Sequence, residues 1–312
     1  MPELCVAFWN VCNLFEAGVV CRGPADQAAY EQRVAQVARV VSSLHPGQPD
    51  LVALCEVGSA RVAADVAAQV GLPTFSYHFE PATAADATGL MLLWKPLRVT
   101  LDTMTLLDGG RRPFAASARF ELNASGSRPF HLVVNHWKSD LPTPGGPAPS
   151  VRREETARLV RTHLEQLPLD ESALLLGDFN AEPWAPELGR SGLRASRRHS
   201  QARAYNGRIG GLYNSGWRFA GAPEPWEASR AQGYAASRPQ CSYAGKKGSP
   251  RLLLDQMIVS SGALRGPTLS LREAEVRYHC SGDTARRDGR GHWLPAAACS
   301  DHLPLVARFD TC

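Results

Sequence analysis

The sequence predicts an α+β fold, because strand patterns outnumber helix patterns and neighbouring strands often follow one another directly. Short runs rich in branched and aromatic residues, each bounded by turn residues, are typical of buried strands. They predict strands at 4–11, 51–57, 89–95, 116–122, 130–137, 173–179, 251–260 and 302–309.

Three helices are expected between these strands. Asp26 is a candidate N-cap for the first, and residues 60–70 form a short Ala/Val-rich segment. Ser150 is expected to cap the third, after the Pro/Gly loop at 141–150. The apolar residues at helical spacing are Val34, Val37, Val41 and Leu44 in the first helix, and Ala157, Val160, Leu164 and Leu167 in the third.

The composition is that of an ordinary globular protein, with 44% hydrophobic and 21% charged residues. A net charge of +4 is too small to imply nucleic acid or a membrane surface by itself. Strand patterns of one type lie on both sides of the Pro/Gly loop. We therefore expect one domain over residues 1–312, with a loop-rich basic insert at 185–250.

The N-terminal residues carry no basic leader, and the apolar runs are far shorter than a bilayer span. Eight cysteines are scattered without a tight spacing, which favours free thiols over a disulfide framework. We expect a cytoplasmic protein without a membrane span, and nothing in the sequence implies a protein partner.

Polar residues follow six of the hydrophobic segments at the point where each segment ends. Six such segment ends at equivalent positions predict one polar pocket at a rim of the sheets, accessible to solvent. They are Asn10, Glu56, His136, Asp178 with Asn180, Asp255, and Asp301 with His302.

The side chains of this predicted pocket suit phosphate ester hydrolysis. Carboxylate and amide oxygens are hard ligands, which favour Mg²⁺, with Mn²⁺ as a substitute, over Zn²⁺. Histidines beside the metal offer acid–base chemistry near neutral pH. A hard cation and amide donors together stabilise charge that develops on phosphoryl oxygens.

The same residues carry a family resemblance. The blocks FWNVCNL, LCEV, NHWKS, LLGDFNAEP, LLDQMIVS and SDHLPL, in this order over residues 6–309, resemble the endonuclease/exonuclease/phosphatase superfamily. Its members include pancreatic-type deoxyribonucleases, abasic-site endonucleases, neutral sphingomyelinases and inositol-polyphosphate 5-phosphatases. The resemblance implies a four-layer αββα sandwich with its active site at one rim of two packed sheets.

The resemblance also implies roles for individual residues. Glu56 matches a metal-binding glutamate, with Asn10 beside it as a metal or phosphate ligand and Asp301 as a further metal or orienting ligand. Asp178 is expected to act on the attacking water and Asn180 to hold a phosphoryl oxygen, both on one face of an extended strand. The remaining predicted residues are the catalytic His302 with its carboxylate partner Asp255, the second histidine His136, and Lys138 and Ser139 as phosphate contacts.

Two departures argue against an abasic-site endonuclease. Those enzymes carry an aspartate where this chain has Cys12, and a tyrosine where it has His136. The NHWKS block is more similar to bacterial nuclease-type members of the superfamily.

Residues 190–208 contain six arginines and no acidic residue. With Tyr205, Tyr213 and Trp217 nearby, this stretch predicts a nucleic-acid track with stacking platforms, in which Arg198 contacts phosphate; a solvated basic face is the alternative. The stretch 279–293, followed by Cys299, fits no standard zinc spacing, and its arginines at 286, 287 and 290 are expected at the pocket mouth.

Three functions follow from these observations. The favoured one is a Mg²⁺-dependent phosphodiesterase of the nuclease type, acting on DNA or RNA. The alternative is a phosphoesterase acting on a small molecule or lipid headgroup, of the sphingomyelinase or inositol-phosphatase kind. A binding protein that has lost catalysis is disfavoured, because every catalytic position that we can match is intact.

Overall fold

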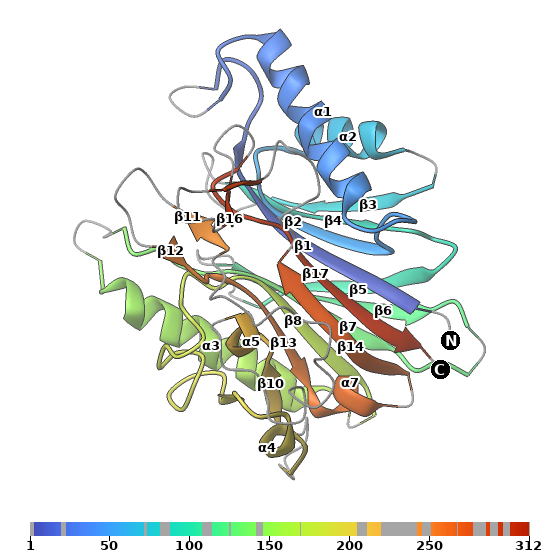
Figure 1. The fold of residues 1–312 in the computed structure, drawn as a ribbon, viewed down its shortest axis with the longest axis vertical. Coiled ribbons are helices and arrows are strands. Elements are labelled where there is room, and N and C mark those ends of the chain that lie inside the picture. The colour runs from blue at the N-terminus through green and yellow to red at the C-terminus, as the bar shows by residue number, and fades with distance from the viewer. Residues whose placement is uncertain are drawn as a thin grey trace.

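Two mixed β-sheets lie face to face in the computed structural model of this chain (Figure 1). One sheet has the strand order β14-β17-β1-β2-β4-β3, and the other has the order β5-β6-β7-β8-β13-β10-β9. Two short ribbons, β11-β12 and β15-β16, complete the described strands. The structure describes residues 3–19, 23–71, 74–81, 88–107, 114–124, 126–141, 146–168, 170–204, 211–219, 242–244, 251–266, 268–276, 285–287, 293–295 and 300–311.

The elements have the following bounds. The strands of the first sheet are β1 (Glu3–Leu14), β2 (Leu51–Val57), β3 (Ser76–Glu80), β4 (Gly89–Trp94), β14 (Leu269–Val276) and β17 (Leu305–Thr311). Those of the second are β5 (Val99–Leu106), β6 (Phe114–Leu122), β7 (Phe130–His136), β8 (Ser172–Asp178), β9 (Ala195–Ser196), β10 (Leu212–Asn214) and β13 (Asp255–Ser260). The ribbons are β11 (Tyr243–Ala244) with β12 (Arg251–Leu252), and β15 (Ala285–Arg287) with β16 (Trp293–Pro295); the helices are α1 (Gln27–Ser43), α2 (Ala60–Val70), α3 (Pro149–Gln166), α4 (His199–Ala204), α5 (Gly216–Phe219) and α7 (Ser261–Arg265).

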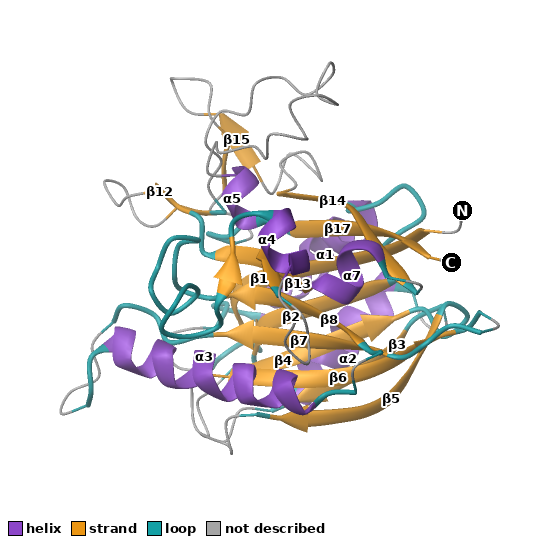
Figure 2. Cartoon of the chain, turned by 90° about the horizontal axis from the view of Figure 1, so that it is seen from below, coloured by secondary structure: helices purple, strands orange, loops and turns teal. Residues whose placement is uncertain are grey.

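Alternation along the strands produces four layers. In β1, Leu4, Val6 and Phe8 enter the core between the sheets, whereas Cys5, Ala7 and Trp9 pack against α1 and α2. On the other side, α3 covers the outer face of the second sheet (Figure 2). The predicted αββα sandwich is therefore confirmed.

The helix predictions are confirmed except for one cap. Asp26 caps α1 by accepting the Ala29 N–H at 2.8 Å. The expectation that Ser150 caps the third helix is wrong: α3 begins one residue earlier, at Pro149, and Ala148 is its N-cap without a side-chain hydrogen bond. Proline suits this first position because its missing N–H would have no helical partner there.

Four strands that the sequence pattern did not predict lie at sheet edges. β14 and β3 are the two edges of the first sheet, and β5 and β9 are the two edges of the second. An edge strand is less enclosed than a central one, so it needs no continuous apolar run. The predicted strand 251–260 is also divided into β12 and β13, and the last strand begins at Leu305 instead of His302.

Among the described residues, no helix combines the length and the apolar character that a membrane crossing requires. The cytoplasmic location and the single domain both stay predictions.

A buried arginine holds α3 to the loops beside the predicted pocket. The Arg153 guanidinium donates to Glu187 Oε1 at 2.9 Å and to Asp140 Oδ1 at 2.7 Å. Glu187 is buried, so removing the arginine would leave its charge unpaired in the interior.

We expect Arg153→Leu to lower the free energy of unfolding by about 3–5 kcal/mol. Urea denaturation would measure this change in the free energy of unfolding. Arg158→Leu is the matched control on the same helix, because Arg158 makes an exposed pair with Glu154 and its removal is expected to cost less than about 1 kcal/mol. Equal losses in the two variants would contradict the importance of the buried network.

Candidate active site

The second sheet brings three polar residues to one rim through its register. His136 is opposite Asp178 in the parallel pair β7–β8, and Asp178 is opposite Asp255 in the antiparallel pair β8–β13. Side chains alternate along a strand, and each of these three lies on the same face of its strand as residues of the core between the sheets, such as Leu176 in β8 and Met257 in β13. The three side chains therefore end the apolar core at this rim.

The first sheet contributes Asn10 and Glu56 from the adjacent parallel strands β1 and β2. Asn10 continues the inward-facing series of Leu4, Val6 and Phe8. Glu56 has the opposite parity, but its φ of 65° and a register shift beside it interrupt the strand. This irregular backbone allows the carboxylate to reach His136 of the facing sheet, with Oε1 3.4 Å from Nε2.

Asn10 joins two carboxylates that come from different sheets. Its Nδ2 donates to Glu56 Oε1 at 3.0 Å and to Asp178 Oδ2 at 3.1 Å. Its Oδ1 accepts the Cys12 N–H at 2.9 Å, and the second oxygen of Glu56 accepts the Asn13 N–H at 2.7 Å. Asn10 thus directs its amino group at the carboxylates, and metal coordination by its oxygen would require the amide to turn over.

His302 and Asp255 form a buried pair. His302 Nδ1 lies 2.8 Å from Asp255 Oδ2, and Nε2 lies 3.8 Å from Asp178 Oδ2 and 3.9 Å from Asp301 Oδ1. Asp178 and His302 are only 2% and 6% exposed, so the expectation of solvent-accessible side chains is wrong for these two. The strands of both sheets enclose them, which fits a reaction site from which bulk water is partly excluded.

The carboxylates around His302 favour its protonated form. Burial opposes the charged imidazolium, but the negative charges of Asp255 and Asp178 outweigh it and raise the pKa of His302 to about 10. Burial raises the pKa of Asp255 to about 6, even though the charge of His302 opposes that increase. The higher pKa belongs to the histidine, so an imidazolium beside a carboxylate is the state that faces Asp178.

Glu56 and His136 also stabilise each other's charged forms. Burial would raise the pKa of Glu56, but hydrogen bonding and charge from His136, with the Asn10 amide, lower it to about 2. Burial likewise opposes the charged form of His136, yet the hydrogen bond and charge of Glu56 raise its pKa. Glu56 therefore stays ionised over the physiological range, as a metal-binding carboxylate must.

A turn, and not strand alternation, brings Asp178 and Asn180 together. β8 ends at Asp178, and Asn180 has a φ of 46°, which is left-handed and incompatible with an extended strand. Its N–H donates to Asp178 Oδ1 at 2.9 Å, while its Nδ2 donates to the Trp137 carbonyl at 2.9 Å. The predicted proximity is present, but its stated cause was wrong because aspartate can form such a turn with its own backbone.

The residue before Asp178, Gly177, has to be a glycine because β7 approaches its backbone closely. Its φ is 153°, and a Cβ at this position would lie 2.0 Å from the Asn135 carbonyl oxygen on β7. No other residue fits without moving one of the two strands.

The described residues offer ligands for a divalent metal. Asp178, Asp255 and His302 have donor atoms within 4.8 Å of one another. Asp255 is already hydrogen-bonded to His302, so this group is better suited to proton handling. Glu56 and Asp301 supply further carboxylate oxygens of the kind that a hard cation prefers. Those of Glu56 already accept from Asn10 and the Asn13 N–H, whereas the Asp301 side chain is 38% exposed.

Cys12 remains a protonated thiol beside these carboxylates. Burial, followed by the charges of Asp301 and Glu56, raises its pKa to about 12. The residue therefore adds no charge at the position where abasic-site endonucleases have an aspartate.

The predicted phosphate contacts are not all at the site. Lys138 and Ser139 follow β7 directly, and Lys138 Nζ donates to the Leu141 carbonyl at 2.6 Å. Arg198 instead follows β9, which pairs with β10. The paired part of β10 lies opposite Val259 and Ser260, at the far end of β13 from Asp255. Four to five residues of β13 separate that end from Asp255, which is roughly 13–17 Å. A contact between Arg198 and phosphate at this rim is therefore not supported.

The basic stretch also differs from its predicted form. Tyr213 is 2% exposed and packs in the core between the sheets, so it offers no stacking platform. Tyr205, the arginine at 290 and the zinc-like cysteines and histidines of 279–299 lie outside the described residues, and the structure describes only the backbone of β15, which contains 286 and 287.

Sequence reasoning missed several polar residues that support the site. Ser242 Oγ accepts the Asp255 N–H at 2.9 Å, and the Tyr243 ring lies 4.8 Å from the His302 ring. Ser300 Oγ donates to the Asn10 carbonyl at 2.7 Å and accepts the His302 N–H. Ser242 and Tyr243 end no hydrophobic run, so the pattern that identified the other residues could not reveal them. Ser300 does follow the short apolar run 296–299, but only the next two residues were selected there.

A four-layer αββα sandwich with carboxylates and a His–Asp pair at one rim defines a class of metal-dependent phosphoesterases. A sequence model of the Endonuclease/Exonuclease/phosphatase family matches residues 7–302. The chain belongs to this family, whose members are metal-dependent phosphoric ester hydrolases. Among curated proteins, none matches the sequence significantly.

Solved structures share the fold at low sequence identity. D. rerio TDP2 complexed with single-strand DNA product is 16% identical, covers 100% of both chains and has a TM-score of 0.60. The human Nocturnin catalytic domain with bound sulfate is 16% identical, covers 100% of this chain and 95% of its own, and has a TM-score of 0.61. A family member from Bacteroides vulgatus is 13% identical over 100% of both chains, with a TM-score of 0.61.

Proposed function

We propose that this chain is a Mg²⁺-dependent phosphodiesterase that hydrolyses nucleic acid by attack of water. One observation carries the proposal: both sheets direct carboxylates to one rim, where Asn10 connects Glu56 with Asp178 and the His302–Asp255 pair lies within 4 Å of Asp178. This combination supports charge stabilisation and proton transfer at a single phosphate.

In this proposal, Glu56 and Asp301 hold the metal, with Asn10 as a further ligand if its amide turns over. The bound cation neutralises charge on the phosphoryl oxygens. Asp178 orients and deprotonates the attacking water. The His302 imidazolium stabilises the phosphoryl group or protonates the leaving oxygen, and Asp255 keeps it charged and oriented.

Of the remaining residues, three are proposed to contact the substrate and one to support Glu56. Asn180 has one amide hydrogen beyond its bond to Trp137, and it is available for a phosphoryl oxygen. Lys138 and Ser139 follow β7 at the same rim and would contact the phosphate if the Lys138 ammonium leaves the Leu141 carbonyl. His136 keeps Glu56 in place and ionised.

One comparison favours nucleic acid as the substrate. D. rerio TDP2, which shares the fold, has been solved with single-strand DNA product. A phosphoesterase for a small molecule or lipid headgroup is the alternative.

Hydrolysis assays would separate these functions. The substrates are single-stranded DNA, duplex DNA, RNA and a small chromogenic phosphodiester, each with Mg²⁺, Mn²⁺ or EDTA. We expect metal-dependent cleavage of a polymer that Asp178→Asn abolishes. Cleavage of the small ester alone would reject the nuclease function, and full activity of Asp178→Asn would reject the mechanism.

A further inference from the structure

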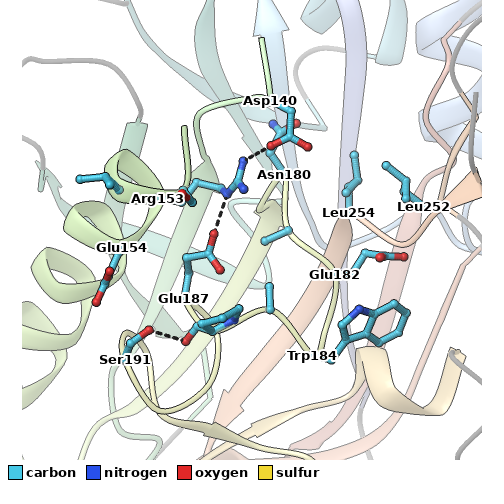
Figure 3. Close-up of a pocket in the computed structure, with 15 residues that line it drawn as sticks. Asp140, Arg153, Glu154, Asn180, Glu182, Trp184, Glu187, Ser191, Leu252 and Leu254 are labelled. Atoms are coloured by element: carbon cyan, nitrogen blue, oxygen red, sulfur yellow. Dashed lines mark hydrogen bonds and ion pairs between the residues drawn. The ribbon is translucent and has the colours of Figure 1, made fainter. Parts of the chain in front are cut away.

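A cavity of about 520 Å³ adjoins the proposed phosphate site (Figure 3). It lies between the start of α3 and the loop that follows β8, and Leu252 and Leu254 form part of its wall. Asn180 belongs both to this wall and to the turn around Asp178, so the cavity opens beside the scissile bond. Its volume is in the range of small-molecule sites.

An exposed tryptophan lies on the wall of this cavity. Trp184 is 54% exposed, which is unusual for the largest apolar side chain, and it comes four residues after Asn180. Its ring meets Trp217 edge-on, with centroids 6.1 Å apart and planes at 61°. Trp217 is not among the residues that line the cavity, so Trp184 is the aromatic side chain of the described wall.

The charges of the cavity select against a second phosphate. Among the described residues, Asp140 and Glu187 are neutralised only in part, because they share the cation of Arg153. Glu154 is paired with Arg158 outside the cavity. Glu182 lies two residues before Trp184 and has no cationic partner among the described residues. Its carboxylate accepts a hydrogen bond from the backbone of Leu253, which leaves further oxygen lone pairs for a ligand.

We propose that this cavity, the Trp184 pocket, binds one unstacked nucleobase of a single-stranded nucleic acid next to the phosphate held at Asn180. The face of the base stacks on the Trp184 indole, as bases do on aromatic side chains of single-strand binders. Glu182 accepts hydrogen bonds from amino groups of adenine, cytosine or guanine, which thymine and uracil lack. This inference rests on the proposed nuclease function and specifies its substrate.

The geometry favours a planar base over an ammonium headgroup. A quaternary ammonium is recognised by a cage of several aromatic faces. In the described part of this wall, Trp184 is the one aromatic side chain, and Trp217 packs against it in an edge-on contact. One flat surface with a hydrogen-bond acceptor beside it suits a flat ring with donors on its edge.

Binding to a protein without turnover tests the pocket separately from the nuclease function. Asp178→Asn protein with Mg²⁺ would be titrated with 5′-labelled dC3 and dT3, and with phosphocholine as competitor. We expect dC3 to bind at least about fivefold more tightly than dT3, and added Trp184→Ala to weaken dC3 binding about tenfold or more. Trp184→Phe should retain most of the affinity, and Glu182→Gln should remove the preference for dC3.

Leu97→Ala, at a 90% exposed residue outside the pocket, controls for the loss of an apolar surface side chain. Unchanged affinities in Trp184→Ala and Glu182→Gln, or displacement of dC3 by phosphocholine at equal concentration, would overturn the inference. If dC3 binds as expected while active enzyme cuts no polymer, the pocket assignment stands and the nuclease function fails. If polymers are cut but neither variant alters binding, the nuclease function stands and the pocket assignment fails.

Discussion

His302→Asn is expected to lower kcat for phosphodiester hydrolysis by about 10²- to 10⁴-fold, the usual effect of removing a general acid or base. The substitution removes the imidazolium that lies 3.8 Å from Asp178 and that Asp255 keeps protonated. Steady-state hydrolysis of the small chromogenic phosphodiester measures the loss directly. KM should change much less than kcat, because the proton is transferred only in the transition state.

The control for this experiment is His78→Asn. His78 is also paired with a carboxylate, Glu80 at 3.2 Å, but it lies on the edge strand β3, outside the site. Asp255→Asn provides a second test, since it removes the partner that orients His302 without removing the imidazole. Thermal unfolding would show that each variant is folded, and a folded His302→Asn protein with full kcat would rule out the proposed role.

The sequence predicted which side chains meet at this rim wherever a residue extends a buried strand. Asn10, His136 and Asp178 continue the inward-facing series of their strands, so the end of each apolar run identifies both the residue and its direction. Asp255 instead begins β13, where it has the inward parity of Met257 and Val259. Two sheets packed face to face then bring these ends together. The same rule explains the success with the central strands, which are apolar on both faces.

Alternation along a strand could not give the direction of side chains on irregular backbone. Asn180 and Glu56 reach the site through left-handed backbone conformations, which no alternation pattern contains. Ser242 and Tyr243 come from a short segment that contacts His302 through tertiary packing alone. Arg198 shows the opposite failure, because its local charge suggested a role that the register of β9 does not support.

Glu56→Gln is expected to raise the Mg²⁺ concentration for half-maximal activity at least about tenfold, since even residues that only support metal ligands typically contribute 10- to 100-fold. The amide keeps the size of the carboxylate and can still accept the Asn13 N–H, but it removes the negative charge that a hard cation requires. Activity measured against Mg²⁺ concentration gives this value. Calorimetric titration of the same proteins with Mg²⁺ alone separates metal binding from turnover.

Glu80→Gln is the matched control, because it changes the carboxylate of a similar glutamate–histidine pair away from the rim. It should leave the Mg²⁺ dependence unaltered. Without metal, Glu56→Gln should also be less stable than the parent protein at pH 7. The pKa of Glu56 is lowered to about 2, so its ionised form stabilises the fold above the unfolded pKa of about 4.3, and this contribution disappears as the pH falls toward 2. An unchanged Mg²⁺ requirement together with this loss of stability would make Glu56 a structural partner of His136 and would leave Asp301 and Asp178 as the carboxylates that bind the metal.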